Sequence, residues 1–205
     1  MKEFLNILDP ISLIHAVGLL GIFLVVFAES GIFVGFFLPG DSLLFTSGLL
    51  ASQGILNIYT LVPVVFVAAI LGDNIGYTFG RKIGIKIFTK EDSIFFHKDH
   101  IARAQHFYEK YGKKTIVLAR FIPVVRTFAP ILAGVGGMSY QTFLVYNIVG
   151  AFFWAVGLTL AGYLLGNLVP NIDKYLFPII GGIILLSFLP VIREVFHILK
   201  EKHKK

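Results

Sequence analysis

Apolar stretches occupy most of the chain, and four of them are long enough to cross a membrane as single helices. A bilayer core about 30 Å thick is spanned by about 20 residues of α-helix. The four stretches cover residues 11–28, 55–79, 140–166 and 174–193. The pattern therefore predicts an all-α polytopic membrane protein with about four transmembrane helices.

Two more apolar stretches, residues 31–51 and 115–137, are interrupted by proline and glycine. Pro39 and Gly40 break the first stretch, and Pro123 and Pro130 break the second. Irregular backbone at membrane depth must be buried in protein or line a wet cavity, because lipid cannot satisfy its N–H and C=O groups. We predict that both stretches are re-entrant hairpins whose tips meet inside the helix bundle.

The two halves of the chain resemble each other weakly. Phe37-Leu38-Pro39 parallels Phe121-Ile122-Pro123, and Gly80-x-x-x-Gly84 parallels Gly162-x-x-x-Gly166. Paired, interrupted apolar segments point to an inverted-repeat transporter with its site at the repeat interface. Glycine and proline are common in membrane helices, however, so the similarity also fits two unrelated halves.

This pattern predicts a single membrane domain over residues 1–205. Its parts are a first half (11–84, with the hairpin 31–51), a cytoplasmic loop (80–114), a second half (115–193, with the hairpin 115–137) and a basic tail (194–205). The apolar run before Glu29 also resembles a signal peptide, but the equally apolar segment that follows favours a retained helix.

Composition supports membrane insertion. The chain has 205 residues, of which 56% are hydrophobic, and it contains no cysteine, which excludes disulfides, thiol catalysis and cysteine-ligated zinc. The net charge of +6 arises largely between residues 80 and 114 and in the tail. Under the positive-inside rule both regions are cytoplasmic, as are both termini, so the charge requires no nucleic-acid partner.

Within the loop, Ile101, Ala104, Tyr108 and Tyr111 have helical spacing and predict a cytoplasmic amphipathic helix, either at the lipid interface or packed on the bundle.

Two arginines lie within the second interrupted stretch. A cationic side chain in a membrane segment costs roughly 3 kcal/mol or more, so Arg120 and Arg126 should face a partner, a cavity or a substrate. Their planar guanidinium groups can each bind a phosphate through two hydrogen bonds. We predict that both bind a substrate phosphate; the alternative for Arg120 is an extension to lipid head groups at the cytoplasmic boundary.

Acidic residues occur near the first interrupted stretch. Glu29 and Asp41 flank it, and we expect them to be either counter-ions of the arginines or proton carriers. Asp73 lies in the second spanning segment, where pairing with Arg81 or Lys82 is the ordinary expectation and a supporting role in transport the alternative. Further supporting residues are expected at Pro39, Gly40, Pro123 and Gly134.

Histidines do not indicate a metal site. His97, His100 and His106 lie with Asp99 in the polar loop, and their spacing matches no recognised ligand set. We therefore expect neither a metal nor a cofactor. A membrane phosphatase would need a nucleophile beside an activated base or a metal, and no histidine lies in the charged hairpins, so an enzyme is not expected.

Three ordered motifs resemble the DedA family of bacterial membrane proteins, which is related to the eukaryotic VTT-domain lipid scramblases. They are FxxPGD ending at Asp41, GDNIGYTFGRKIG from Gly72, and ARFIPVVRTFAPILAGVGGMSYxxFxxxNxxGAxxW from Ala119. The resemblance covers roughly residues 15 to 167. It implies re-entrant hairpins in an inverted repeat, and it places the family's essential acids on Glu29 and Asp41 and its essential arginines on Arg120 and Arg126.

The resemblance also implies a function: transport of undecaprenyl phosphate or a similar polyprenyl-phosphate lipid across the bacterial cytoplasmic membrane, with a link to the proton motive force. Membrane lipids and protons are the expected partners, and a homo-oligomer remains open. The alternatives are a proton/cation antiporter, which the paired intramembrane arginines disfavour, and a general phospholipid scramblase.

Overall fold

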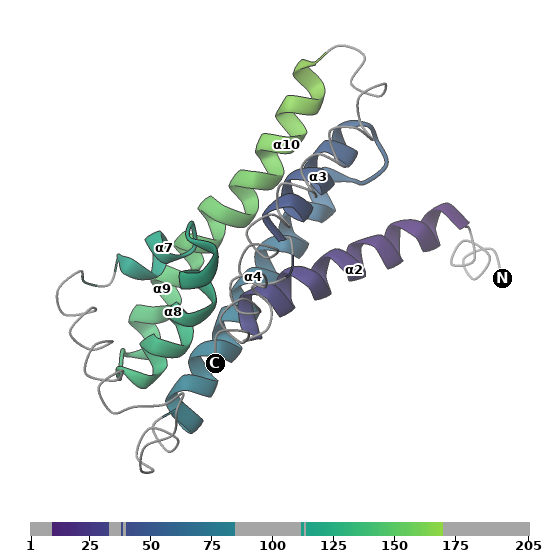
Figure 1. The fold of residues 1–205 in the computed structure, drawn as a ribbon. Coiled ribbons are helices and arrows are strands. Elements are labelled where there is room, and N and C mark those ends of the chain that lie inside the picture. Colours follow the sequence, from purple (N-terminus) through teal and green to yellow (C-terminus); the bar gives the residue numbers. More distant parts are fainter. Residues whose placement is uncertain (1–9, 33–37, 39, 85–111, 113, 170–205) are drawn as a thin grey trace, which may run out of the picture.

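The computed structural model describes residues 10–32, 38, 40–84, 112 and 114–169, and every regular element in these residues is a helix (Figure 1). The α-helices are α2 (Pro10–Gly31), α3 (Gly40–Ser52), α4 (Ile58–Phe79), α7 (Thr115–Ala119), α8 (Pro123–Val135), α9 (Tyr140–Ala151) and α10 (Gly157–Leu168). Two π-helical segments, η2 (Gly80–Gly84) and η3 (Phe152–Val156), extend α4 and join α9 to α10.

Two continuous helical stretches are long and apolar enough to cross a membrane. Ile58–Lys82 has 25 residues and Tyr140–Leu168 has 29. Each begins at a polar cap: the Asn57 side chain accepts the Tyr59 N–H at 2.9 Å, and Ser139 accepts the Thr142 N–H at 3.4 Å. The helices expected over 55–79 and 140–166 are therefore present, and α2 corresponds to the expected 11–28.

Short helices pack against long ones in two places. In Figure 1, α3 lies beside α10, whereas α7, α8 and α9 gather at the other end of α4. The α3–α10 contact is so close that a Cβ atom on Gly48 would collide with the Thr159 carbonyl, and one on Gly162 with the Phe45 carbonyl.

The contact between α8 and the end of α4 has the same form. A Cβ atom on Gly134 would collide with the Tyr77 carbonyl, and one on Gly80 with the Ile131 carbonyl. Tyr77 and Gly80 precede Thr159 and Gly162 by 82 residues, and Phe45 and Gly48 precede Ile131 and Gly134 by 86. A glycine-mediated contact between a short helix and a long helix thus occurs twice, at corresponding positions.

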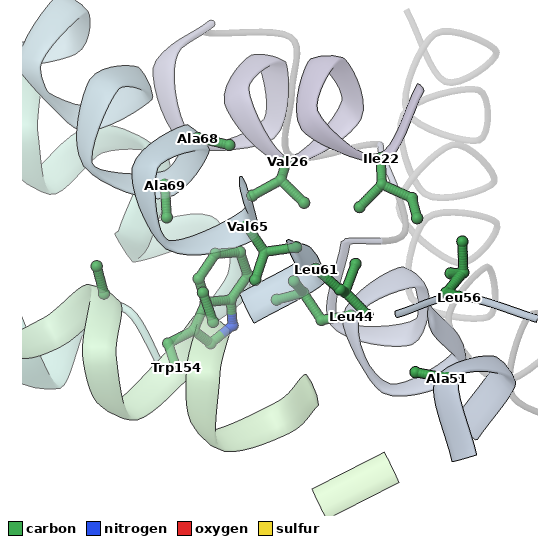
Figure 2. Packing of buried hydrophobic residues seen from close by; sticks show 12 residues of the cluster. Ile22, Val26, Leu44, Ala51, Leu56, Leu61, Val65, Ala68, Ala69 and Trp154 are labelled. Atoms are coloured by element: carbon green, nitrogen blue, oxygen red, sulfur yellow. The ribbon is translucent and has the colours of Figure 1, made fainter. Parts of the chain in front are cut away.

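The hydrophobic core joins α2, α3, α4 and η3 (Figure 2). Val26 of α2, Leu44 of α3 and Val65 of α4 are fully buried around Trp154 of η3, which is 2% exposed. Large apolar side chains also cover the outside, for example Phe153 at 59% and Leu164 at 57% exposure. Such a surface suits contact with lipid tails rather than water.

The break expected at Pro123 is present, whereas the one expected at Pro130 is not, because Pro130 lies inside α8 and the helix continues through it to Val135. Residues 115–137 divide into α7 and α8, with a turn at residues 120–122, and α3 forms the second part of 31–51. Pro39, the amphipathic helix of the basic loop, the span 174–193 and the tail lie outside the described residues.

Candidate functional site

Arg126 lies in the first turn of α8, where Pro123 fixes the start of the helix. Ile122 is extended, as a residue before proline prefers, and its carbonyl accepts the Arg126 N–H at 2.9 Å. The arginine is 6% exposed. Its Nη1 donates to Asp41 Oδ1 at 2.6 Å, and its Nη2 donates to Glu29 Oε1.

The two carboxylates around Arg126 differ in their access to solvent. Glu29, near the end of α2, is completely buried, whereas the Asp41 side chain is 47% exposed. Gly40 makes this arrangement possible, because a Cβ atom there would overlap Glu29 Oε2. Arg126 therefore pairs with one carboxylate that solvent cannot reach, Glu29, and with one that solvent can reach, Asp41.

Arg120 ends α7 and belongs to a second buried network. Its Nη2 donates to Asp73 Oδ2 and to Asn147 Oδ1, and it lies 3.5 Å from the Ala69 carbonyl. Only 4% of Arg120 is exposed, and Gly150 leaves room for it, since a Cβ atom there would lie 2.8 Å from Arg120 Cδ. The alternative in which Arg120 extends to lipid head groups is therefore wrong.

The expected partner of Asp73 is also wrong. Asp73 is 4% exposed and forms its salt bridge with Arg120. Arg81 instead donates to the Tyr77 hydroxyl and the Met138 carbonyl, both at 3.1 Å. The reason is the direction of each side chain: Asp73 of α4 faces Arg120 and Asn147, and Arg81 of η2 reaches Met138 in the loop before α9.

Trp154 contacts both networks and was missed as a functional residue by the sequence reasoning. Its ring centroid lies 4.9 Å from Arg126 Cζ and 5.8 Å from Arg120 Cζ, within the range of cation–π attraction. The indole N–H donates to Asp41 Oδ1 at 2.6 Å. One signal could have indicated it: Asn147 and Trp154, seven residues apart in an apolar stretch, project from one helical face.

The two networks together carry more negative than positive formal charge. Arg120 and Arg126 supply two positive charges, against three negative ones from Glu29, Asp41 and Asp73. Further hydrogen bonds can form in this cluster, because the Nε atoms of both arginines and Glu29 Oε2 are buried without a hydrogen-bond partner. An anion can therefore bind at the arginines most readily when a carboxylate moves away or takes up a proton.

An open apolar groove of about 480 Å³ lies over α2 and α4. Its lining includes the apolar side chains of Phe27, Leu71, Ile75 and Phe79, and the positively charged side chain of Lys82. Its size and apolar lining suit a hydrocarbon chain. Among the described residues, no group of three or more histidine, aspartate or glutamate side chains could hold a metal ion.

Comparisons with known proteins identify the family. The VTT domain model matches residues 38–164, more than half of the chain. Protein DedA of Escherichia coli K12 is 45% identical over 186 residues, covering 90% of this chain and 82% of DedA. An uncharacterized membrane protein of Mycobacterium leprae is 47% identical over 173 residues (84% and 77%). Inner membrane protein YqjA of Escherichia coli K12 is 33% identical over 175 residues (85% and 78%).

No solved structure matches the chain. Two of these relatives are named membrane proteins, in agreement with the apolar exterior and with the two helices long enough to cross a membrane. The chain therefore belongs to the DedA family of membrane proteins, which carry the VTT domain.

Proposed function

We propose that the protein transports undecaprenyl phosphate, or a similar polyprenyl-phosphate lipid, across the bacterial cytoplasmic membrane. Arg126 and Arg120 bind the phosphate, and the apolar tail remains in contact with lipid and with apolar grooves on the helices. Glu29 and Asp41 replace the phosphate on Arg126 when the lipid is released.

The observation that carries this proposal is that the two carboxylates paired with Arg126 differ in exposure to solvent. A buried guanidinium is costly in a membrane protein unless it is paired, and Arg126 is paired on both terminal nitrogens. One of these partners, Asp41, has a half-exposed side chain. A phosphate arriving from that side can replace Asp41 and form the paired hydrogen bonds that a guanidinium group favours.

Charge balance supports a link to protons. A phosphate monoester carries about −1.5 to −2 charges near neutral pH, and it approaches two networks whose formal charge is already −1, from two arginines and three carboxylates. Protonation of Asp41 or Glu29 removes one negative charge and frees a guanidinium nitrogen. We propose that this proton is taken up as the phosphate binds and is lost as the ion pairs re-form.

The architecture we propose is an inverted repeat with two re-entrant hairpins, 31–51 and 115–137. It is supported by the corresponding glycine contacts, in which α3 packs on α10 and α8 packs on the end of α4. Each short helix thus contacts a long helix of the opposite half, as expected at a repeat interface. In this topology both termini and the basic loop are cytoplasmic.

We propose transport rather than hydrolysis for a chemical reason. The described charged cluster offers arginines, carboxylates, an asparagine and a tryptophan. Each of the three carboxylates is paired with an arginine, whereas a phosphatase would need a free nucleophile beside an activated base or a metal. The cluster can hold and release a phosphate without breaking its ester bond.

Reconstitution in liposomes tests the function. Purified protein is inserted into vesicles that contain undecaprenyl phosphate, and a periplasmic-type phosphatase added outside reports the fraction of lipid accessible in the outer leaflet over time. We expect the protein to give access to the inner-leaflet pool, and a pH gradient to change the rate. A phosphatidylglycerol reporter in matched vesicles distinguishes a general scramblase.

The inactive control is Arg126→Gln, which removes the charge at the centre of the site. Equal exchange of undecaprenyl phosphate by this variant and the wild-type protein, or equal exchange in vesicles without protein, would overturn the proposal. Cation-dependent proton flux without lipid exchange would instead identify an antiporter.

A further inference from the structure

Trp154, the chain's single tryptophan, shares one carboxylate oxygen with Arg126. Its indole N–H donates to Asp41 Oδ1 at 2.6 Å, and Arg126 Nη1 donates to the same atom at 2.6 Å. A hydrogen bond to a charged group stabilises it more than a bond between neutral groups does. Asp41 is therefore held from two sides, although its side chain is 47% exposed.

The position of Trp154 is fixed by the core rather than by the site. The residue lies in the π-helical segment η3 and is 2% exposed, packed with Val65 and Ala69 of α4 (Figure 2). Because the ring is tightly packed, its N–H donates from a fixed position, and this hydrogen bond holds the Asp41 carboxylate there.

We propose that Trp154 is a positioning residue that holds Asp41 beside Arg126 and thereby sets how readily a phosphate head group replaces Asp41. This inference rests on the proposed function. Without ligand, the indole N–H stabilises the Asp41–Arg126 ion pair and so weakens phosphate binding. With ligand bound, the same N–H keeps the displaced carboxylate nearby, where it can recapture Arg126 and release the phosphate.

A purely structural role for Trp154 predicts a different result. The ring fills space between α4 and the α9–α10 helix, and it faces two guanidinium groups. If these contacts were its whole contribution, removal of the N–H alone would leave phosphate binding unchanged. Removal of the whole ring would lower stability and weaken binding together.

The test replaces a single atom. Because the chain has one tryptophan, it can be produced with β-(3-benzothienyl)alanine in place of tryptophan, which substitutes sulfur for the indole N–H and preserves the ring shape. Trp154→Phe is the genetic counterpart. Phe152→Leu is the matched control, since Phe152 is 54% exposed in the same segment and its ring packs edge-to-face against Phe153.

Binding of farnesyl phosphate to the detergent-purified protein is measured by calorimetry, and transport of undecaprenyl phosphate is measured in liposomes. We expect both Trp154 replacements to lower the Kd by about tenfold or more, the worth of one hydrogen bond to a charged group, and to slow transport. Phe152→Leu should change neither value.

Two negative results can be distinguished, one against the proposed function and one against the positioning role of Trp154 alone. A wild-type protein that does not bind farnesyl phosphate would remove the proposed function and this inference with it. A wild-type protein that binds, while the benzothienyl protein binds equally or more weakly, would overturn the positioning role alone and leave Trp154 as a packing residue.

Discussion

Loss of the Asp73 charge should unfold the protein more readily than loss of the Asp41 charge, although both residues pair with an arginine. Asp73 and Arg120 have only 5% and 4% of their side chains exposed, so Asp73→Asn leaves a guanidinium buried without a counter-ion. Removal of one partner from a buried pair costs about 3–5 kcal/mol. The asparagine oxygen can still accept a hydrogen bond, which places the expected cost near the lower end, about 3 kcal/mol.

Asp41→Asn should cost much less. Its side chain is 47% exposed, so water can solvate the asparagine, and Glu29 remains bonded to Arg126 as its counter-ion. The cost should therefore be closer to the roughly 1 kcal/mol of an exposed pair than to that of a buried one. For a chain of about 200 residues each kcal/mol shifts Tm by roughly 2–4 °C. We therefore expect Asp73→Asn to lower Tm by roughly 6–12 °C and Asp41→Asn by at most about 4 °C.

Thermal unfolding of the two purified variants in one detergent, followed by circular dichroism, measures this difference. Asp73→Ala serves as a second variant, since it also removes the acceptor oxygen and should be less stable than Asp73→Asn. Equal Tm values for Asp73→Asn and Asp41→Asn would refute the claim that the Arg120–Asp73 pair contributes more to stability than the Arg126–Asp41 pair, which a ligand can exchange more readily.

Further predictions address the site, the packing and the topology. Arg126→Lys retains the charge but loses the planar guanidinium, so transport should fall at least tenfold while folding survives; near-normal transport by a lysine at this position would exclude a paired phosphate contact. Gly134→Val and Gly48→Val should each destabilise the protein, because their side chains would meet the Tyr77 and Thr159 carbonyls; Gly157→Val, at a position with open space, is the control and should be tolerated in unfolding measurements. Single cysteines at Ser52 and Asn171 should react with an impermeant thiol reagent from outside, and one at Ser93 only after the cytoplasmic face is opened; labelling of position 93 from outside would contradict the two-hairpin topology.

The breaks in the apolar pattern could be predicted from the sequence because they have local causes. Pro123 has no N–H to donate and restricts the residue before it, so α7 must end and α8 can begin there. The lengths of α4 and of the α9–α10 helix follow equally from uninterrupted apolar runs. The charged residues were found because isolated charges in such runs are costly.

The pairing of an arginine with Glu29 and Asp41 was one of two expectations, but which arginine pairs with which acid could not be predicted, because it depends on contacts between residues far apart in the chain. Arg126 and Glu29 are 97 residues apart, and Arg120 and Asp73 are 47 apart. Sequence reasoning assigned Asp73 to its near neighbours Arg81 and Lys82, which lie on another part of the helix surface. Trp154 was missed because an aromatic residue in an apolar helix usually serves in packing, and only its N–H distinguishes it.

The central claim is that a lipid phosphate takes the place of Asp41 on Arg126, and dipolar coupling between ³¹P and ¹⁵N measures this contact directly. Protein with ¹⁵N-labelled arginine is reconstituted with farnesyl phosphate in bilayers and studied by solid-state NMR, with Arg126→Lys and Arg81→Lys as paired variants for assignment. The account predicts guanidinium nitrogens within about 4 Å of phosphorus, with a coupling that loses the Arg126 contribution in Arg126→Lys and is unchanged in Arg81→Lys. A coupling that is unchanged in Arg126→Lys, or none in the wild-type protein with ligand bound, would contradict it.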